Sequence, residues 1–295
     1  MRLLPIAQKW SIIRSLSHIL FAYGRALGQG MAERVRSMLA EERQTKILEV
    51  IHNIGEVSVS EICNAFDVSE MTARRDLREL DRQGLLRRIH GGAIANLGRS
   101  YEPPFPARAT KNLEAKVAIG KAAANLVYDG DSIALDVGTT TLQIVSALKP
   151  KRNLTIVTSC LQIANRVVSE LSLSANVRLI LTGGIVRPRE LSMTGAIPQN
   201  TYGELHVDKA FIGIGGIHPT NGLTEYNLED AEIKKVLIQS ARERIVVADG
   251  SKFGLTAFAS VASLQSIDAV VTDTLAPAEW VNAIRENGVK VIIAN

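Results

Sequence analysis

The spacing of hydrophobic positions between residues 32 and 95 is helical at first and strand-like afterwards. From Ala32 to about Gly55, apolar residues recur every three or four positions, which predicts an amphipathic helix. Ser58 and Glu61 have the spacing of a capping box, so a second, short helix is expected to begin at Ser58. Ser69 is placed to cap a third helix that ends at about Gln83.

A hairpin is predicted directly after the third helix. Leu85–Ile89 and Ala93–Ala95 are short runs of strand-forming residues, and Gly91-Gly92 between them predicts the positive φ angles of a two-residue turn. Three helices followed by such a hairpin are typical of a winged helix-turn-helix. We therefore expect this domain over residues 31–95.

The rest of the chain alternates short apolar runs with helical patterns. The runs are Ser132–Val137, Leu154–Thr158, Val177–Leu181, Ala210–Gly215, Arg244–Ala248, Ala269–Thr272 and Val289–Ala294. Helices are predicted between several of them, at Thr141–Leu148, Leu161–Leu171, Asp230–Glu243 and Pro277–Asn287. Strands that are apolar throughout and joined by helices predict an α/β domain with a mainly parallel sheet, here over residues 114–295. Residues 96–113 hold several prolines among polar residues and are predicted to be a linker.

Composition and charge fit two globular domains and point to nucleic acid at one end. Hydrophobic residues are 46% of the 295 and charged residues 22%, which is ordinary globular usage. Residues 1–99 carry 15 Lys and Arg against 11 Asp and Glu, while residues 100–295 are balanced, so the whole net charge of +4 lies in the N-terminal third. Aromatic residues, at 4%, are too few for a platform that stacks single-stranded nucleic acid.

The two cysteines, Cys63 and Cys160, are far apart and fit no metal-ligand or redox spacing. They predict buried free thiols and a reducing, cytoplasmic compartment. No stretch reaches the ~18 uninterrupted apolar residues of a membrane span, and we expect no membrane association.

Residues 1–30 stand apart, with four basic residues, no acidic ones and an apolar patch around Ile12–Tyr23. Charges interrupt every apolar stretch, which excludes a signal peptide. We expect a disordered extension, or one that is not translated if Met31 is the true start. A weakly amphipathic targeting or membrane-surface segment is the alternative.

The third helix has two chemically different faces. At 100° per residue, Ala73, Leu77 and Leu80 form a narrow apolar stripe that would pack on the other helices. The opposite side presents arginines, whose planar forks suit guanine edges and phosphate oxygens in a major groove. The predicted DNA contacts are Ser69, Met71, Thr72, Arg74, Arg75, Arg78 and Arg82 on this helix, with Arg88 and His90 on the wing. The alternative is a merely solvated face, in which these arginines pair with Asp76, Glu79 and Asp81.

Several strand ends in the second domain carry residues that suit an anionic ligand. Ligands of open α/β sheets bind at the carboxyl ends of strands, where glycine turns expose amides and hydroxyls. The candidate effector residues are Asp136, Gly138, Thr139, Thr140, Gly183, Gly184, Arg187, Glu225, Asp249 and Lys252. Cations and amides would hold a phosphate, and carboxylates would hold hydroxyl groups, so a phosphorylated polyol fits. Each glycine turn alone is also explained as a simple change of chain direction.

Two motifs of the predicted DNA-binding domain are more specific. Residues 69–77 read S-E-M-T-A-R-R-D-L and residues 88–93 read R-I-H-G-G-A. They resemble the DeoR family of bacterial regulators, which shows S-x-x-T-x-R-R-D-L in its recognition helix and R-x-H-G-G-A in its wing. Ala73 stands where a larger branched residue is usual, a departure that leaves the outward face intact.

The resemblance extends from about Glu42 to Asn295 and does not cover residues 1–30. It implies a sensor domain similar in fold to ribose-phosphate isomerases and coenzyme A transferases, which responds to phosphorylated sugars. The family's recurrent segments are present as Asp136–Thr140, Gly183–Arg187, Asp208–Phe211, Gly222–Glu225 and Asp249–Gly254. By this likeness the effector would lie among these loops.

We therefore expect a repressor of sugar catabolism genes that binds a double-stranded operator as a homo-oligomer and is released by a phosphorylated sugar. No metal, cofactor or catalysis is predicted. One alternative is an isomerase-like enzyme with a DNA-binding appendage, in which Glu225, Asp136 and Asp249 act as acids or bases and Lys252 steadies an enediolate. Another is a winged helix that contacts only protein.

Overall fold

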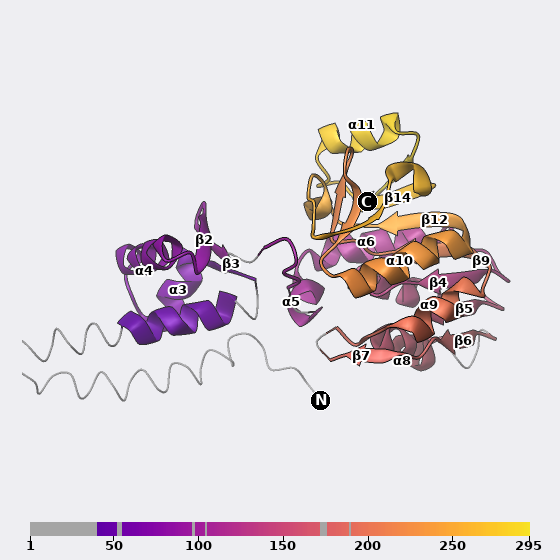
Figure 1. The fold of residues 1–295 in the computed structure, drawn as a ribbon, viewed down its shortest axis with the longest axis horizontal. Coiled ribbons are helices and arrows are strands. Elements are labelled where there is room, and N and C mark those ends of the chain that lie inside the picture. The colour runs from indigo at the N-terminus through magenta and orange to yellow at the C-terminus, as the bar shows by residue number, and fades with distance from the viewer. Residues whose placement is uncertain (1–39, 52–54, 96–97, 104, 172–175, 189) are drawn as a thin grey trace, which may run out of the picture. The chain divides into compact units, whose positions relative to one another are not determined.

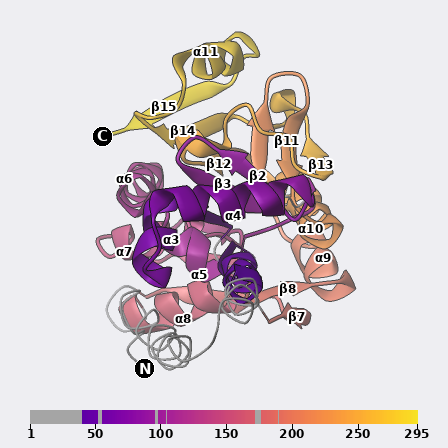
Figure 2. The same ribbon diagram turned by 90° about the vertical axis from the view of Figure 1, so that its left-hand side faces the viewer.

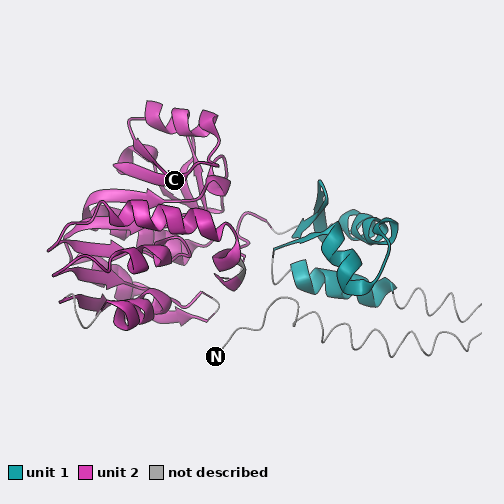
Figure 3. Cartoon of the chain, turned by 180° about the vertical axis from the view of Figure 1, so that it is seen from behind, with its two compact units in different colours: residues 1–97 teal, residues 98–295 magenta. Residues whose placement is uncertain are grey.

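The computed structural model describes residues 40–51, 55–95, 98–103, 105–171, 176–188 and 190–295. The chain divides into two compact units, residues 1–97 and 98–295 (Figure 3). The predicted extension, residues 1–30, lies outside the described residues. None of the helices in the described ranges has the length and hydrophobicity that a bilayer crossing requires.

The first unit contains the three helices and the hairpin that the sequence predicts. Its helices are residues 40–51, α3 (Val59–Phe66) and α4 (Glu70–Arg82), and its strands are β1 (Glu56–Ser58), β2 (Leu86–Ile89) and β3 (Gly92–Ala95). Residues 32–39 and 52–54 of the first predicted helix lie outside the described residues. Ser58 caps α3 through a complete capping box with Glu61, and the Ser69 side chain accepts a hydrogen bond from the Thr72 amide at the start of α4. Both predicted helix starts are confirmed.

The wing differs from the predicted hairpin in two details. A third strand, β1, pairs antiparallel with β3, so the sheet order is β1-β3-β2. The turn consists of His90 and Gly91, and Gly91 alone has a positive φ, of 82°. Gly92 already belongs to β3, where an added Cβ would lie 2.3 Å from the Val57 carbonyl oxygen. The second glycine therefore allows β1 and β3 to approach closely and does not form the turn.

The second unit contains a seven-stranded sheet in the order β15-β14-β12-β9-β4-β5-β6, and all its strand pairs are parallel. Each predicted apolar run supplies one strand: β4 (Ser132–Leu135), β5 (Thr155–Thr158), β6 (Arg178–Leu181), β9 (Val207–Ile212), β12 (Ala241–Val247), β14 (Ala269–Asp273) and β15 (Lys290–Ala294). The prediction of a mainly parallel α/β domain is confirmed.

Helices cover both faces of this sheet (Figures 1 and 2). They are α6 (Leu113–Ala124), α7 (Thr141–Ala147) and α8 (Leu161–Glu170) on one face, and α9 (Ala196–Gly203), α10 (Leu228–Ser240) and α11 (Ala278–Glu286) on the other. In β4, Ile133 and Leu135 pack with the first group, and Ala134 packs with the second. The apolar runs within these strands lack polar alternation because both faces of the sheet are buried there. Charged residues occur near the amino ends of some strands, as Arg242 and Glu243 do in β12.

Smaller elements, which the apolar runs do not predict, lie outside the seven-stranded sheet. They are two small antiparallel sheets, β7 (Ile185–Arg187) with β8 (Ser192–Thr194), and β10 (Gly216–His218) with β11 (Gly222–Glu225) and β13 (Ala259–Ala262), and the short 3₁₀ turns η2 (Gly250–Lys252) and η3 (Leu264–Ser266). Several candidate effector residues lie on these elements.

The predicted linker, residues 96–113, is only partly a linker. The boundary between the two units falls between Leu97 and Gly98, inside this range. However, helix α5 (Phe105–Thr110) follows, and Phe105 is 3% exposed within the core that α6, α7 and α8 share. Pro106 is the second residue of α5, a position where its missing N–H and fixed φ are tolerated. The prolines therefore did not exclude a packed helix.

The free cysteines differ in exposure. Cys160 is buried as predicted, and burial raises the pKa of its thiol, whereas Cys63 is only partly buried.

Candidate functional site

Helix α4 separates an apolar face from a basic face as its sequence predicts. Ala73, Leu77 and Leu80 are at most 2% exposed and pack in the core of the first unit. On the other side Met71 is 76% exposed, and the four arginines, Arg74, Arg75, Arg78 and Arg82, are all exposed. The helix thus docks by one stripe and offers cations on the other.

The arginines of α4 make few intramolecular interactions, and these are exposed. Arg74 pairs with Glu70 at 2.9 Å and Arg82 with Glu79 at 2.7 Å, both at the surface. Hydrogen bonds from Arg82 and Gln83 lower the pKa of Glu79 to about 2. Among the described residues Arg75 has no ion-pair or hydrogen-bond partner. Exposed pairs of this kind contribute little, so the arginines can exchange these carboxylates for phosphate.

Asp76 has a different role from the one that a solvated face would give it. It is 3% exposed, and its carboxylate accepts hydrogen bonds from Arg43 at 2.5 and 3.1 Å and from Gln44 at 3.2 Å. This buried contact ties helix 40–51 to α4. Asp76 therefore fixes the orientation of the basic face instead of neutralising it.

The wing adds Arg88 and His90, which are both exposed. The backbone amide of Arg88 donates to Asp81 Oδ1 at 3.2 Å, so the third acidic residue of the alternative hypothesis anchors the wing to the end of α4. Side chains of α4 and of the wing thus belong to one compact unit.

In the second unit, Asp136 and Glu225 meet at a lysine that the sequence analysis missed. Lys234 of α10 donates to Asp136 Oδ2 and lies 3.3 Å from Glu225 Oε2. Gly213 also donates its amide to Asp136 Oδ2, at 3.0 Å. The side chains of Lys234 and Asp136 are each 1% exposed. Within the described ranges Asp136 Oδ1 has no hydrogen-bond partner, so one buried acceptor remains unused.

Asp136 and Lys234 both bind their protons more tightly than isolated side chains do. Burial raises the pKa of Asp136 to about 6, although Lys234 acts in the opposite direction. Burial alone would lower the pKa of Lys234, but Asp136 and Glu225 outweigh it and raise that pKa above its usual range. Both shifts follow from two carboxylates sharing one ammonium group in a buried place.

The signal for Lys234 was present in the sequence. It lies three and four residues before Leu237 and Ile238, on the buried stripe of α10. A lysine inside an apolar stripe needs a buried partner of opposite charge, so its position in the stripe already indicates a buried carboxylate nearby.

A second group of candidate residues lies around η2. Asp249 is 2% exposed and accepts hydrogen bonds from Asn112 at 3.0 Å and from Ser251. Burial raises the pKa of Asp249, but these hydrogen bonds and two nearby lysines outweigh it, and the pKa is lowered. The Lys252 ammonium nitrogen lies 3.3 Å from the Tyr226 hydroxyl and above the Tyr226 ring. Tyr226 directly follows Glu225 in the sequence, so this group lies near the first.

The glycine turns have clear backbone roles. Gly138 follows β4, and an added Cβ would lie 2.9 Å from Thr141 Oγ1. The neighbouring Thr139 and Thr140 are buried. Gly183 and Gly184 have φ angles of 76° and 127°, which L side chains rarely adopt. Gly183 and Gly184 are thus required for their backbone conformation and Gly138 for the space beside Thr141, whether or not these turns hold a ligand.

Arg187 joins the same region through ion pairs. It pairs with Asp230, one turn before Lys234 on α10, and with Glu102 at 2.9 Å. Glu102 also pairs with Arg108, which pairs in turn with Glu190. Arg187 is therefore already engaged by two carboxylates.

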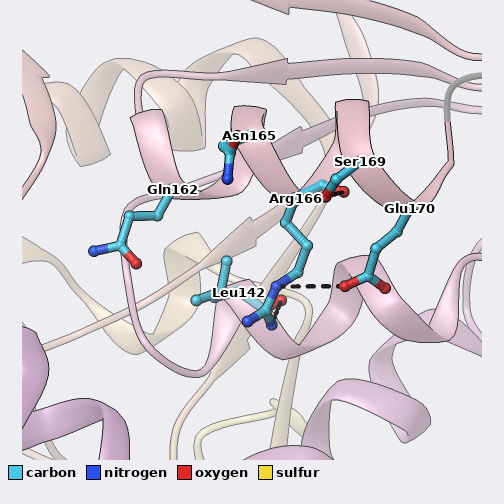
Figure 4. Close-up of a pocket in the computed structure, with 6 residues that line it drawn as sticks. All are labelled: Leu142, Gln162, Asn165, Arg166, Ser169 and Glu170. Atoms are coloured by element: carbon cyan, nitrogen blue, oxygen red, sulfur yellow. Dashed lines mark hydrogen bonds and ion pairs between the residues drawn. The ribbon is translucent and has the colours of Figure 1, made fainter. Parts of the chain in front are cut away.

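A pocket in the second unit lies elsewhere (Figure 4). Its lining comes from α7 and α8 and consists of Leu142, Gln162, Asn165, Arg166, Ser169 and Glu170. None of these is a candidate effector residue. In the described ranges no group of three or more His, Cys, Asp or Glu side chains could hold a metal ion.

Comparison with known proteins supports both units. Residues 43–97 match the model of the DeoR-like helix-turn-helix domain, and residues 111–274 match that of the DeoR C-terminal sensor domain. The chain is 37% identical to the uncharacterized HTH-type transcriptional regulator YulB of Bacillus subtilis, over 86% of this chain and 96% of that protein. It is 32% identical to the glycerol-3-phosphate regulon repressor of Escherichia coli, over 86% of this chain and 99% of that protein.

These relatives are named as regulators, which favours the regulator over the isomerase-like alternative. Among solved structures, ribose 5-phosphate isomerase A of Methanocaldococcus jannaschii is similar over 48% of this chain and 55% of its own, with 19% identity and a TM-score of 0.35. A likeness at that level says nothing about activity. The matches to both domain models and the relatives that extend over most of the chain show that it belongs to the DeoR family of helix-turn-helix transcriptional regulators.

Proposed function

We propose that this regulator represses genes of sugar catabolism and that a phosphorylated sugar releases it from its operator. The observation that carries the proposal is the exposed arginine face of α4, set on a helix whose opposite face is buried. The name of the E. coli relative, a glycerol-3-phosphate regulon repressor, supports repression and a phosphorylated effector.

The DNA-binding surface would be formed by α4 and the wing. Arg74, Arg75, Arg78 and Arg82 would enter the major groove with Met71, while Ser69 and Thr72 would contact DNA at the helix start. Arg88 and His90 would contact the backbone beside the groove. Two such surfaces from a homo-oligomer would bind paired half-sites of double-stranded DNA.

The effector would bind at the carboxyl end of the sensor sheet. Asp136, with its unused oxygen, and Glu225 and Asp249 offer acceptors for sugar hydroxyl groups. The phosphate would be held by Lys252, by Arg187 and by the turns Gly138–Thr140 and Gly183–Gly184. Lys234 would hold two of the carboxylates in place. Release follows only if the ligand binds the free arrangement more tightly than the DNA-bound one.

An operator gel shift challenged with sugar phosphates tests both halves of the proposal. The operator is selected from a random-sequence DNA library with the wild-type chain, and the probes are glycerol 3-phosphate, ribose 5-phosphate and glucose 6-phosphate. Arg75→Ala is expected to cost roughly 1–3 kcal/mol of operator affinity with sugar-phosphate binding intact. Lys252→Ala is expected to weaken the response to the probe without loss of DNA binding. Lys235→Ala, a change on an exposed surface pair, is the control for both.

Unchanged operator binding by Arg75→Ala would contradict the assignment of α4. A normal response of Lys252→Ala would contradict the effector site. A salt titration separates DNA contact from protein contact, because phosphate contacts predict a steep loss of affinity with salt. Rapid turnover of a sugar phosphate would instead support an enzyme.

A further inference from the structure

Helix α5, with Glu102 three residues before it and Asn112 two residues after it, forms a segment that we call the strap. At its first end, the Glu102 carboxylate contacts Arg108 at 2.9 Å through Oε1 and Arg187 at 2.9 Å through Oε2. Asn227, the N-cap of α10, donates to the same carboxylate at 3.3 Å. The Glu102–Arg108 pair lies within the strap, whereas Arg187 and Asn227 hold Glu102 to the rest of the sensor unit.

The other end of the strap is held at η2. Asn112 donates to Asp249 Oδ1 at 3.0 Å. The buried Lys116 of α6 donates to the carbonyl oxygens of Arg108 and Lys111, which closes the turn between α5 and α6. Between these ends, Phe105 is inserted into the core. The strap is therefore attached at both ends and in the middle.

Its two ends lie at different strands of the sheet. Asp249 follows the carboxyl end of β12. The β7–β8 hairpin, which carries Arg187, is attached at the carboxyl end of β5, because the Met193 amide donates to the Ser159 carbonyl oxygen at 2.8 Å. The sheet order places β9 and β4 between β12 and β5. The strap therefore crosses the carboxyl edge where Asp136 follows β4. In Figure 2, α5 is seen between α6 and α7 on one side and α9 and α10 on the other.

The ion pairs at the first end are short of positive charge. Two guanidinium groups, Arg108 and Arg187, face three carboxylates, Glu102, Glu190 and Asp230. Burial raises the pKa of Glu190 to about 7, and the carboxylates of Glu102 and Asp230 act in the same direction, against the two arginines. A phosphate that approaches Arg187 adds further negative charge, so it competes with a carboxylate already bound there. Glu190 and Asp230 belong to the body of the sensor unit, and Glu102 is the carboxylate on the connection to the DNA-binding unit.

We propose that Glu102 occupies part of the anion site as an internal competitor, and that a phosphorylated ligand displaces it and loosens the strap. This inference rests on the proposed function, including the pairing of two chains on one operator. A fixed strap restricts the point from which the chain leads to each DNA-binding unit. A loosened strap frees that point, so more conformational entropy is lost when two DNA-binding units bind paired half-sites, and binding becomes less favourable.

The test uses full-length Glu102→Gln with Glu114→Gln as the matched control, because Glu114 is exposed at the start of α6. Without ligand, Glu102→Gln is expected to weaken operator binding by about fivefold or more. Simple electrostatics predicts the opposite sign, since the variant removes a negative charge. Hydrogen exchange of the α5 amides is expected to accelerate in Glu102→Gln and to stay unchanged in Glu114→Gln. Asn112→Ala, which frees the other end, is expected to act in the same direction.

The ligand arm separates the two proposals. The probes are glycerol 3-phosphate, ribose 5-phosphate and glucose 6-phosphate. Glu102→Gln is expected to bind the probe that releases the wild type more tightly than the wild type does. Addition of that probe is expected to reduce the operator affinity of Glu102→Gln by a smaller factor than it reduces that of the wild type. If no probe releases the wild type, the proposed effector class fails, while operator affinity and exchange still decide on the strap. If Glu102→Gln and Glu114→Gln agree in operator affinity and in α5 exchange, the strap hypothesis is overturned.

Discussion

Replacing Lys234 with methionine tests the buried charge group of the sensor unit. The side chain of Lys234 is 1% exposed and holds Asp136 and Glu225, which are themselves buried. Methionine fills a similar volume but leaves two carboxylates without their cation. Removal of one partner from a buried ion pair costs about 3–5 kcal/mol, and we expect a loss of this size in the free energy of unfolding at pH 8.

The loss is expected to shrink as the pH falls. In the variant, Asp136 and Glu225 are buried without a cation, so at least one of them must take up a proton in the folded state. The pKa of that carboxyl group is then higher in the folded state than in the unfolded state. A raised carboxyl pKa gives stability that is present at low pH and lost as the pH rises. Each pH unit above the unfolded pKa costs about 1.4 kcal/mol per proton, so the penalty at pH 5.5 should be smaller by up to about 3 kcal/mol.

The measurement is urea unfolding followed by tryptophan fluorescence in a Trp10→Phe background. Trp280 is then the sole tryptophan, and it packs against the core shared by α9, α10 and α11, so the signal reports the sensor unit. Lys235→Met is the control, because Lys235 pairs with Glu232 at the surface and its loss should cost less than about 0.5 kcal/mol. Equal losses of stability in the two variants at pH 8, or a loss in Lys234→Met that does not depend on pH, would refute a buried charge group held by Lys234.

Two further predictions concern the DNA-binding unit. Asp76→Ala leaves Arg43 without its buried partner and should destabilise this unit by about 3 kcal/mol. The expected readouts are faster hydrogen exchange of the α4 amides and weaker operator binding. Exchange rates equal to those of the wild type would argue against the buried contact. Gly92→Ala places a Cβ 2.3 Å from the Val57 carbonyl oxygen and should lower the free energy of unfolding by about 1–3 kcal/mol, measured by thermal unfolding. Gly98→Ala is the control, because open space surrounds that position, and it should be neutral. Equal melting temperatures of the two variants would count against the close approach of β1 and β3.

Local signals explain why the DNA-binding unit was well predicted. The caps at Ser58 and Ser69 and the apolar stripe of α4 each depend on residues within one or two turns of one another. Strand β1 was missed because three residues are too few to show alternation, and its partner β3 begins more than thirty positions later. Phe105 was placed in a linker because its burial depends on helices α6 to α8, which the local sequence does not reveal.

In the sensor unit, the strands followed from burial on both faces, but their order did not. Whether β4 pairs with β9 or with another strand depends on how the connecting helices pack. The candidate site shows the same limit. Asp136 and Glu225 were identified from the loops that carry them, whereas Lys234, 98 positions after Asp136, becomes their partner only when α10 covers the sheet.

The strand order of the sensor sheet also has a consequence for synthesis of the chain. In the DNA-binding unit the sheet closes within residues 56–95, so this unit can fold soon after it leaves the ribosome. In the sensor unit, β4 pairs on one side with β5 and on the other with β9, whose paired residues lie 76 positions later. The central edge of the sheet therefore stays open, on the order of seconds at usual translation rates, until β9 and β12 have emerged. A nascent chain thus carries a folded DNA-binding unit before the domain that would control it exists, and a chain truncated before β9 would keep the first without the second.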